Sequence, residues 1–162
     1  MQGIMEERQE KDFMTTIRYI LAVGLLIAVL SHLGCSNEFV DGEIPPATFD
    51  DIFINLDLPQ YTDLTIDGGH ILLNQGVRGI ILYRVNASQY NAFERNCSYE
   101  PNAACATVEV HSSGLFLDDP CCGSSFSLQD GTPTGGPARV SLRRYRIERS
   151  GRNLTITDEP IF

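Results

Sequence analysis

The sequence contains few of the side chains from which catalytic sites are usually built. It has three histidines in 162 residues. The two that follow the N-terminal third, His70 and His111, stand outside any Cys-x-His or Cys-x-x-His spacing. No serine–histidine–acid triad, phosphate-binding glycine loop or paired-carboxylate site stands out, and acids beside a proline, such as Asp118 and Asp119, are typical of turns. We therefore expect a protein that is not an enzyme.

Positive charge is absent from a long stretch of the chain. No Lys or Arg occurs between Arg18 and Arg78, and the net charge of the whole chain is −9. This balance argues against nucleic-acid binding, because such binding requires a basic surface. The segment 139–152, by contrast, carries six arginines. We expect these arginines to form a solvated sheet face that pairs with acidic segments, with docking of a protein partner as the alternative.

The N-terminal third lacks an apolar run of the length that a membrane span requires. Its uninterrupted apolar run covers residues 19–30, whereas a transmembrane helix needs about twenty residues. A short apolar core followed by small residues is typical of a secretory signal. The sequence Gly34-Cys35-Ser36 resembles a bacterial lipoprotein processing site, with lipidation at Cys35, and an uncleaved single-pass anchor helix is the alternative. Both interpretations place the remaining chain in the bacterial cell envelope, tethered to a membrane, in the periplasm or at the cell surface.

Charge also bears on where translation starts. Acidic residues outnumber basic ones in the first 13 positions, where a signal is normally basic, so we expect the true start at Met14. We divide the chain into a signal or anchor segment (1–35), an acidic tether that contains a Pro-Pro pair (36–51) and a folded domain (52–162).

The folded domain has the pattern of short β-strands separated by turns. Apolar and polar residues alternate, or form short apolar runs, between clusters of Gly, Ser, Asn and Pro. We expect strands at residues 52–58, 79–85, 90–94, 106–110 and 115–117, and a strand or a helical turn at 70–73. Because no convincing helix lies inside the domain, the pattern predicts an all-β sandwich or barrel.

Two adjacent cysteines, Cys121 and Cys122, lie between a proline and a glycine, and a Gly-Gly-Pro turn follows at 135–137. This segment resembles the second cluster-binding loop of Rieske iron–sulfur proteins. The matching residues are Pro120, Gly123, Ser124, Phe126, Leu128, Gly131, Gly136, Pro137 and Ala138. The segment around Cys97 resembles the first loop, and residues 140–147 and 154–156 resemble the closing strands. The resemblance covers about residues 77–157 and implies a small sandwich or barrel of antiparallel strands with two apposed cysteine-bearing loops.

The resemblance implies four ligand positions for the cluster, occupied here by Cys97, Tyr99, Asp119 and Cys122. A Rieske centre binds one iron with two thiolates and the other with two neutral imidazoles. In this chain Asp119 replaces one of the cysteines, and Tyr99 and Cys122 replace the two histidines. One carboxylate, one phenol and two thiols do not reproduce that ligand set. We therefore expect that the cluster has been lost and that no metal or cofactor is bound.

The resemblance also implies a pairing of the cysteines. In respiratory-type Rieske proteins an additional cysteine in each loop forms a disulfide, and Cys105 and Cys121 correspond to this pair by position. Cys97 and Cys122 then remain, one in each loop, and can join in an oxidising compartment. Four cysteines allow three connectivities; we expect Cys105–Cys121 with Cys97–Cys122.

The expected function is that of a membrane-tethered, disulfide-braced structural or binding module. One alternative is an electron-transfer protein that binds an atypical [2Fe–2S] cluster through all four cysteines, since four thiolates are a common iron–sulfur ligand set. A second is a thiol–disulfide catalyst that uses the adjacent Cys121 and Cys122. An iron–sulfur cluster would make the purified protein brown, which separates it from the other two.

Overall fold

The computed structural model describes residue 18 and residues 43–161. The expected signal or anchor, the start at Met14, the lipidation site Cys35 and residues 36–42 of the tether lie outside the described residues. Among the residues that are described, no helix is both long and apolar enough to cross a membrane.

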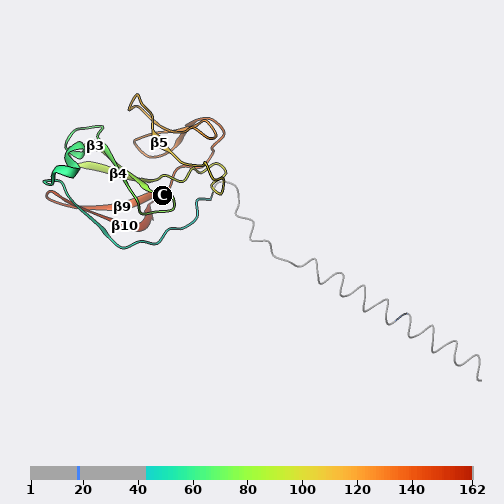
Figure 1. The fold of residues 1–162 in the computed structure, drawn as a ribbon, viewed down its shortest axis with the longest axis horizontal. Helices are drawn as coiled ribbons and strands as arrows, with labels where there is room; N and C mark the ends of the chain where they lie inside the picture. Colours follow the sequence, from blue (N-terminus) through green and yellow to red (C-terminus); the bar gives the residue numbers. More distant parts are fainter. Residues whose placement is uncertain (1–17, 19–42, 162) are drawn as a thin grey trace, which may run out of the picture. The chain divides into compact units, whose positions relative to one another are not determined.

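Two antiparallel sheets make up the described part of the fold (Figure 1). The larger sheet has six strands in the order β1-β10-β9-β4-β3-β2, and the smaller has four in the order β5-β6-β7-β8. The strands of the larger sheet are β1 (Ile52–Asn55), β2 (His70–Leu73), β3 (Ile80–Asn86), β4 (Gln89–Glu94), β9 (Arg144–Ser150) and β10 (Asn153–Ile161). Those of the smaller sheet are β5 (Glu109–Val110), β6 (Leu117–Asp119), β7 (Ser124–Phe126) and β8 (Pro133–Gly135). The expected all-β class is confirmed.

Strand β3 is buried on both faces, which explains its unbroken apolar sequence. Successive side chains of a strand point to opposite faces. Ile80 and Leu82 accordingly belong to one hydrophobic cluster, and Ile81 and Tyr83 belong to another. The second cluster contains residues of β6 and β7, so it joins the two sheets, and it also contains Cys97.

The hairpin expected around the Ser-Ser-Gly turn is present. Its strands, β5 and β6, begin later in the sequence than the expected ranges 106–110 and 115–117. Strand β5 pairs with β6 through Glu109 opposite Asp118 and Val110 opposite Leu117. The segment 70–73, for which a strand or a helical turn was expected, is strand β2 and pairs with β3. The strands expected at 79–85 and 90–94 are β3 and β4, which pair with one another.

A short 3₁₀ helix, η1 (Pro59–Thr65), interrupts the strands and was not expected from the sequence. The strand expected over 52–58 ends at Asn55, whose side-chain Oδ1 accepts the backbone N–H of Asp57 at 2.9 Å. Proline suits the first position of a helix because its φ is already helical and it has no N–H to satisfy. Leu64 is the only buried residue of η1, so the segment has no periodic apolar face that would have revealed it.

The described part of the acidic tether, residues 43–51, packs on the domain. Ile44 is buried, and the ring of Phe49 meets that of Tyr145 edge-on with centroids 5.0 Å apart. A guanidinium nitrogen of Arg143 donates to the carbonyl oxygen of Ile44 at 2.5 Å. Residues 43–51 form neither helix nor strand, and these contacts anchor them to the domain.

Candidate functional site

The first loop of the candidate site, residues 95–108, follows strand β4. Its two ends are held together because the N–H of Val108 donates to the carbonyl of Arg95 at 2.7 Å and Asn96 forms a β-bridge with Thr107. The N–H of Cys97 donates to the carbonyl of Ala106 at 3.2 Å. Cys97 is therefore fixed at the base of the loop, with its side chain in the core that joins the two sheets.

The second loop is the tight connection 120–123 between strands β6 and β7. The N–H of Gly123 donates to the carbonyl of Asp119 at 2.8 Å, and the N–H of Cys121 donates to the Asp119 side-chain Oδ1 at 2.8 Å. Gly123 has a φ of +72°, a conformation that glycine adopts at little cost. Asp119 thus closes the turn through both its backbone and its side chain.

A third segment, the turn after β8, packs on the second loop through Gly136. A Cβ atom at this position would lie 2.4 Å from the carbonyl oxygen of Gly123 and 2.6 Å from the Cα of Ser124. The hydroxyl of Ser124 accepts the N–H of Ala138 at 3.1 Å. Only glycine permits this approach, which places the residues that resemble the Rieske Gly-Pro-Ala sequence directly against the site.

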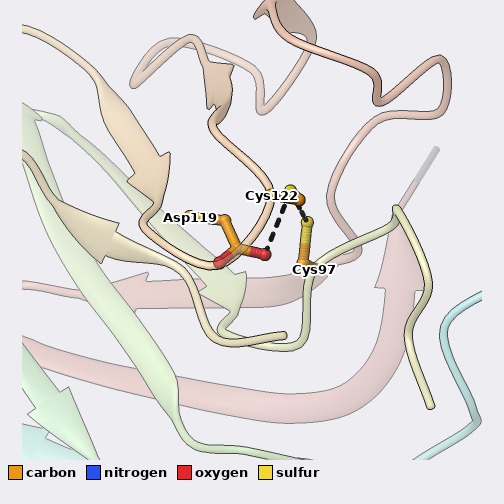
Figure 2. Close-up of side chains that lie close together, drawn as sticks. All are labelled: Cys97, Asp119 and Cys122. Carbon is orange, nitrogen blue, oxygen red and sulfur yellow. Dashed lines mark hydrogen bonds between the residues drawn. The ribbon is translucent and has the colours of Figure 1, made fainter. Parts of the chain in front are cut away.

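Cys97, Asp119 and Cys122 converge between the two loops (Figure 2). The two sulfur atoms lie 3.8 Å apart, and the Cys122 sulfur lies 3.3 Å from Asp119 Oδ2. One thiol sulfur from each cysteine and one carboxylate oxygen all lie within 4.8 Å of one another. We call these three residues the thiol–carboxylate cluster. The sequence-derived ligand positions Cys97, Asp119 and Cys122 are therefore brought together.

The structure does not contain the expected Cys97–Cys122 bridge, and both residues are free thiols. A disulfide requires sulfur atoms about 2.05 Å apart, whereas these sulfurs are in hydrogen-bonding contact. The Cys122 sulfur also lies 3.0 Å from the hydroxyl of Ser124. Oxidation proceeds through a thiolate, and the surroundings of Cys97 disfavour one.

Burial is the largest influence on Cys97, and it raises the pKa of that thiol well above its ordinary range. The neighbouring Asp119 and Cys122 raise the pKa further, because negative charge near a thiol opposes its ionisation. The backbone N–H of Tyr99, 3.5 Å from the Cys97 sulfur, acts in the opposite direction. The thiol form of Cys97 is therefore strongly favoured in the protein.

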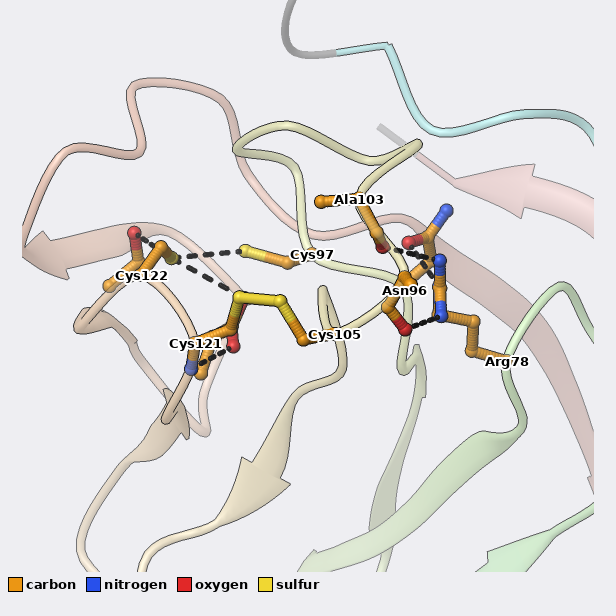
Figure 3. The surroundings of a disulfide bond; sticks show 10 residues. Arg78, Asn96, Cys97, Ala103, Cys105, Cys121 and Cys122 are labelled. Atoms are coloured by element: carbon orange, nitrogen blue, oxygen red, sulfur yellow. Dashed lines mark hydrogen bonds between the residues drawn. A yellow bond between two sulfur atoms is a disulfide. The ribbon is translucent and has the colours of Figure 1, made fainter.

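The disulfide Cys105–Cys121 joins the two loops directly beside the cluster (Figure 3). Its Cα atoms lie 5.7 Å apart, and its residues are 16 positions apart in sequence. This is the pairing that the resemblance implied. The bond therefore links the first loop, which carries the free thiol of Cys97, covalently to the second loop, which carries that of Cys122.

Arg78, which precedes strand β3, is hydrogen-bonded to the first loop, and this role was not predicted from the sequence. Its guanidinium donates to Asn96 Oδ1 at 3.0 Å and to the carbonyl oxygens of Ala103 and Ala104 at 2.6 and 2.8 Å (Figure 3). Its backbone N–H donates to the buried carboxylate of Glu94. The one available signal is that Arg78 is the first Lys or Arg after Arg18.

Neither histidine of the domain lies in the thiol–carboxylate cluster. His70 is on β2, and the ring of His111 stacks on Phe116 with centroids 4.2 Å apart while its Nδ1 lies 2.8 Å from the hydroxyl of Ser113. Tyr99, expected at a ligand position, packs against the core cluster that contains Cys97.

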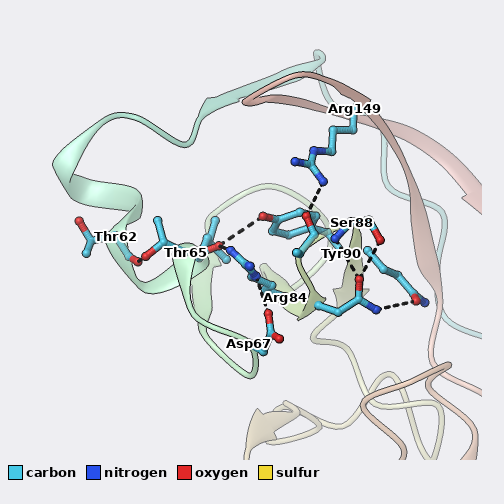
Figure 4. Close-up of polar contacts among 11 residues, drawn as sticks. Thr62, Thr65, Asp67, Arg84, Ser88, Tyr90 and Arg149 are labelled. Atoms are coloured by element: carbon cyan, nitrogen blue, oxygen red, sulfur yellow. Dashed lines mark hydrogen bonds and ion pairs between the residues drawn. The ribbon is translucent and has the colours of Figure 1, made fainter.

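The arginines of 139–152 make contacts within the domain. Arg146 pairs with Glu159 at 2.6 Å and Arg152 pairs with Asp57. Arg149 donates to the carbonyl of Ala87 in the β3–β4 turn, next to Ser88 and Tyr90 (Figure 4). The same view shows Arg84 joining β3 to Asp67, an ion pair of 2.9 Å.

A cavity of about 520 Å³ lies at one end of this arginine-rich segment. Its lining residues are Glu43, Ile44, Asp130, Thr132, Val140, Ser141, Leu142, Arg143, Arg144 and Ile161. The members of the thiol–carboxylate cluster are not among them.

Comparison with known proteins finds similar solved structures. No family model matches the chain, and no curated protein matches it either. The chain is similar to the cyanobacterial plasma membrane Rieske protein PetC3 from Synechocystis PCC 6803, with 24% identity, a TM-score of 0.48, and 59% of this chain and 92% of that one covered.

Two further similar structures concern carbazole 1,9a-dioxygenase. One is a complex of reduced oxygenase and oxidized ferredoxin, with 19% identity and a TM-score of 0.46 over 68% of this chain and 97% of that one. The other is the ferredoxin from Nocardioides aromaticivorans IC177, with 16% identity and a TM-score of 0.42 over 58% and 88%. Because these TM-scores are below 0.5, we base the assignment of function on the residues of this chain.

Proposed function

We propose that this chain is an exported, membrane-tethered, Rieske-like domain that has lost its iron–sulfur cluster and acts as a disulfide-braced structural or binding module without enzymatic activity. The fold presents two loops facing one another, joined by Cys105–Cys121. The proposal of export and tethering rests on the apolar run at 19–30 and on Cys35 in the sequence.

The observation that carries the proposal is the separation of the two free thiols. In the resemblance, Cys97 takes the place of a ligand to one iron and Cys122 the place of a ligand to the other. Their sulfur atoms are 3.8 Å apart, which is the spacing of two ligands on a single ion and leaves no space between them for a two-iron core. Asp119 and Tyr99 are, in addition, poor substitutes for a thiolate and an imidazole. The residues present do not fit a Rieske cluster.

The disulfide argues against the two alternative functions. Because Cys105 and Cys121 are bonded to one another, only two of the four cysteines of the domain are available to a cluster, and a ligand set of four thiolates is excluded while the bond is intact. The adjacent pair Cys121–Cys122 likewise cannot act as a dithiol, since one member is already in a disulfide. The buried Cys97 is a poor nucleophile.

The contacts of the arginine-rich strand favour a structural role for it. Arg146 and Arg152 are paired with acids of neighbouring segments, and Arg143 is directed to the backbone of residue 44. We therefore propose that the main partner of the chain is the membrane, and not a protein that docks on residues 139–152.

The test is a measurement of iron, acid-labile sulfide and visible absorption on the full chain, produced in a bacterium and extracted from the membrane fraction. We expect a colourless protein without stoichiometric iron or sulfide. A brown protein that contains iron and sulfide in equal amounts would show that the cluster has been kept.

A further inference from the structure

We propose that Cys97, Cys122 and Asp119 form a mononuclear zinc site with one coordination position open. This inference rests on the proposed function, because the same three side chains cannot hold a single zinc ion and a two-iron cluster at the same time. Zn²⁺ is the ion of choice because thiolate sulfur combined with a harder donor in a small tetrahedral site is typical of zinc.

The first argument is the spacing of the donor atoms. Zinc–sulfur bonds of about 2.3 Å at a tetrahedral angle place two sulfur ligands about 3.8 Å apart, and the sulfurs of Cys97 and Cys122 are 3.8 Å apart. A zinc–oxygen bond of about 2.0–2.2 Å places a sulfur and an oxygen ligand about 3.5 Å apart. Asp119 Oδ2 lies 3.3 Å from the Cys122 sulfur. Both separations match those of two ligands on one ion, and all three ligand atoms lie within 4.8 Å of one another.

The second argument is that each proposed ligand atom, or the side chain that carries it, is already oriented by a hydrogen bond to a group that is not itself a metal ligand. The N–H of Tyr99 lies 3.5 Å from the Cys97 sulfur, and the hydroxyl of Ser124 lies 3.0 Å from the Cys122 sulfur. The N–H of Cys121 holds Asp119 Oδ1 at 2.8 Å, which leaves Oδ2 directed at Cys122. Metal ligands in proteins are usually fixed by such outer partners, and loss of one partner typically weakens binding by about 10–100-fold.

The third argument is the charge of Asp119. Its side chain is only 1% exposed, and none of the ion pairs formed by the described residues involves it. A buried carboxylate without a cationic partner is costly. A divalent cation between Asp119 and the two thiolates supplies the missing positive charge. Such a cation also explains why a buried acid lies next to two cysteine sulfur atoms.

Three protein donors leave one position of a tetrahedral zinc ion open. Closed structural zinc sites have four protein ligands, whereas sites with three keep a position for water or another small ligand. The His70 and His111 side chains lie elsewhere in the domain. We therefore infer that this position is taken by solvent or a small exogenous donor.

The test combines metal analysis with cobalt substitution of the full chain. The membrane-extracted protein is analysed for zinc, iron and sulfide, then stripped with a chelator and titrated with Co²⁺, whose thiolate charge-transfer band and tetrahedral d–d bands report sulfur coordination. Cys97→Ser, Cys122→Ser and Asp119→Asn are compared with Asp118→Asn, a carboxylate of the same strand that points to the opposite face. Thermal unfolding in chelator shows that each variant folds without metal.

We expect one zinc per chain, tetrahedral cobalt spectra, loss of stoichiometric zinc in each of the three cluster variants and no loss in Asp118→Asn. Ser124→Ala should weaken cobalt binding about 10–100-fold while the spectrum keeps its form. Zinc that survives all three variants, or a Cys97–Cys122 disulfide in the protein as isolated, would overturn the site. Absence of zinc together with absence of iron and sulfide would overturn the site and leave the proposed function standing. Iron with sulfide would overturn both.

Discussion

Tyr145 on strand β9 donates a 2.7 Å hydrogen bond to the carboxylate of Glu94 at the end of β4, and both side chains are buried. Glu94 also accepts the backbone N–H groups of Val77, Arg78 and Asn96 at 2.8–3.0 Å. One carboxylate thereby joins β4, β9, the turn before β3 and the start of the first loop. Glu94 is not part of the thiol–carboxylate cluster, but it fixes the backbone at Asn96, the residue before Cys97.

This pair predicts a loss of stability at alkaline pH. Burial raises the pKa of Tyr145 well above its ordinary value, and the hydrogen bond to Glu94 raises it further. In the unfolded chain a tyrosine ionises near pH 10. Above that pH the folded state therefore binds more protons than the unfolded state, and stability falls as pH rises.

Replacement of Tyr145 by Phe isolates this effect. We expect Tyr145→Phe to lower the free energy of unfolding at pH 7 by about 1.5–3 kcal/mol, the usual contribution of a hydrogen bond to a charged group. The variant should lose less stability than the parent between pH 9 and about 11. Urea unfolding across this range measures both, and equal slopes in the two proteins would contradict the assignment.

The strands could be predicted from the sequence because their signals are local. The apolar run of β3 and the Ser-Ser-Gly turn between β5 and β6 depend only on neighbouring residues. The helix η1 was missed because a segment with one buried residue, Leu64, carries no periodic signal.

The candidate site could be predicted only in part. The loop residues were found through the resemblance, but whether Cys97 and Cys122 are bonded depends on a contact between residues 25 positions apart, which sequence spacing does not determine. Charged residues such as Glu94 and Arg78 are usually solvated, so their buried roles became visible only when the strands were assembled. Asp119 was predicted to be a turn residue; in the structure it closes a turn and is also buried.

Gly136 provides a test of the contact behind the second loop. Gly136→Ala combines a positive φ of +78° with a Cβ atom 2.4 Å from a backbone oxygen. The left-handed conformation costs about 1–2 kcal/mol and overpacking about 1–3 kcal/mol, so we expect a total loss of about 2–5 kcal/mol in unfolding free energy. Gly114→Ala, with a φ of +69° and nothing within 4 Å of the added atom, should show only the conformational part. Equal losses in both variants would contradict the close approach.

The disulfide provides a second test of the same region. The double variant Cys105→Ser, Cys121→Ser should lose about 2–5 kcal/mol of unfolding free energy, since the bond closes a loop of 16 positions. Urea unfolding of the parent in reductant should reproduce the loss, and reductant should not change the midpoint of the double variant. A parent protein that is insensitive to reductant would argue against a bond that braces the loops.

The tether is tested at Cys35, which lies outside the described residues. If Cys35 is the lipidation site that we propose, Cys35→Ala should abolish labelling by radioactive fatty acid and leave a precursor of unprocessed length, because the variant has no thiol to acylate. A parent protein that is membrane-bound and unlabelled would show that the apolar run at 19–30 is an uncleaved anchor.

The two free thiols should differ sharply in reactivity when no metal is present. Cys97 is fully buried, and burial raises its pKa, so almost none of it is thiolate at pH 8. Cys122 is partly exposed. We expect iodoacetamide with a chelator to modify Cys122 in the folded protein and to reach Cys97 only after denaturation, as measured by peptide mass spectrometry.

Arg78 should control that protection, because its three side-chain hydrogen bonds hold the first loop, which carries Cys97. We expect Arg78→Lys to increase the rate of Cys97 alkylation at least tenfold relative to the parent, a change of about 1.4 kcal/mol in the free energy of loop opening, with a much smaller effect on Cys122. Arg152→Lys alters an arginine that contacts Leu56 and Asp57, which directly follow strand β1, and it should leave both rates unchanged. Equal acceleration by the two variants would mean that Cys97 is alkylated through global unfolding. Arg78 would then not control local opening of the first loop.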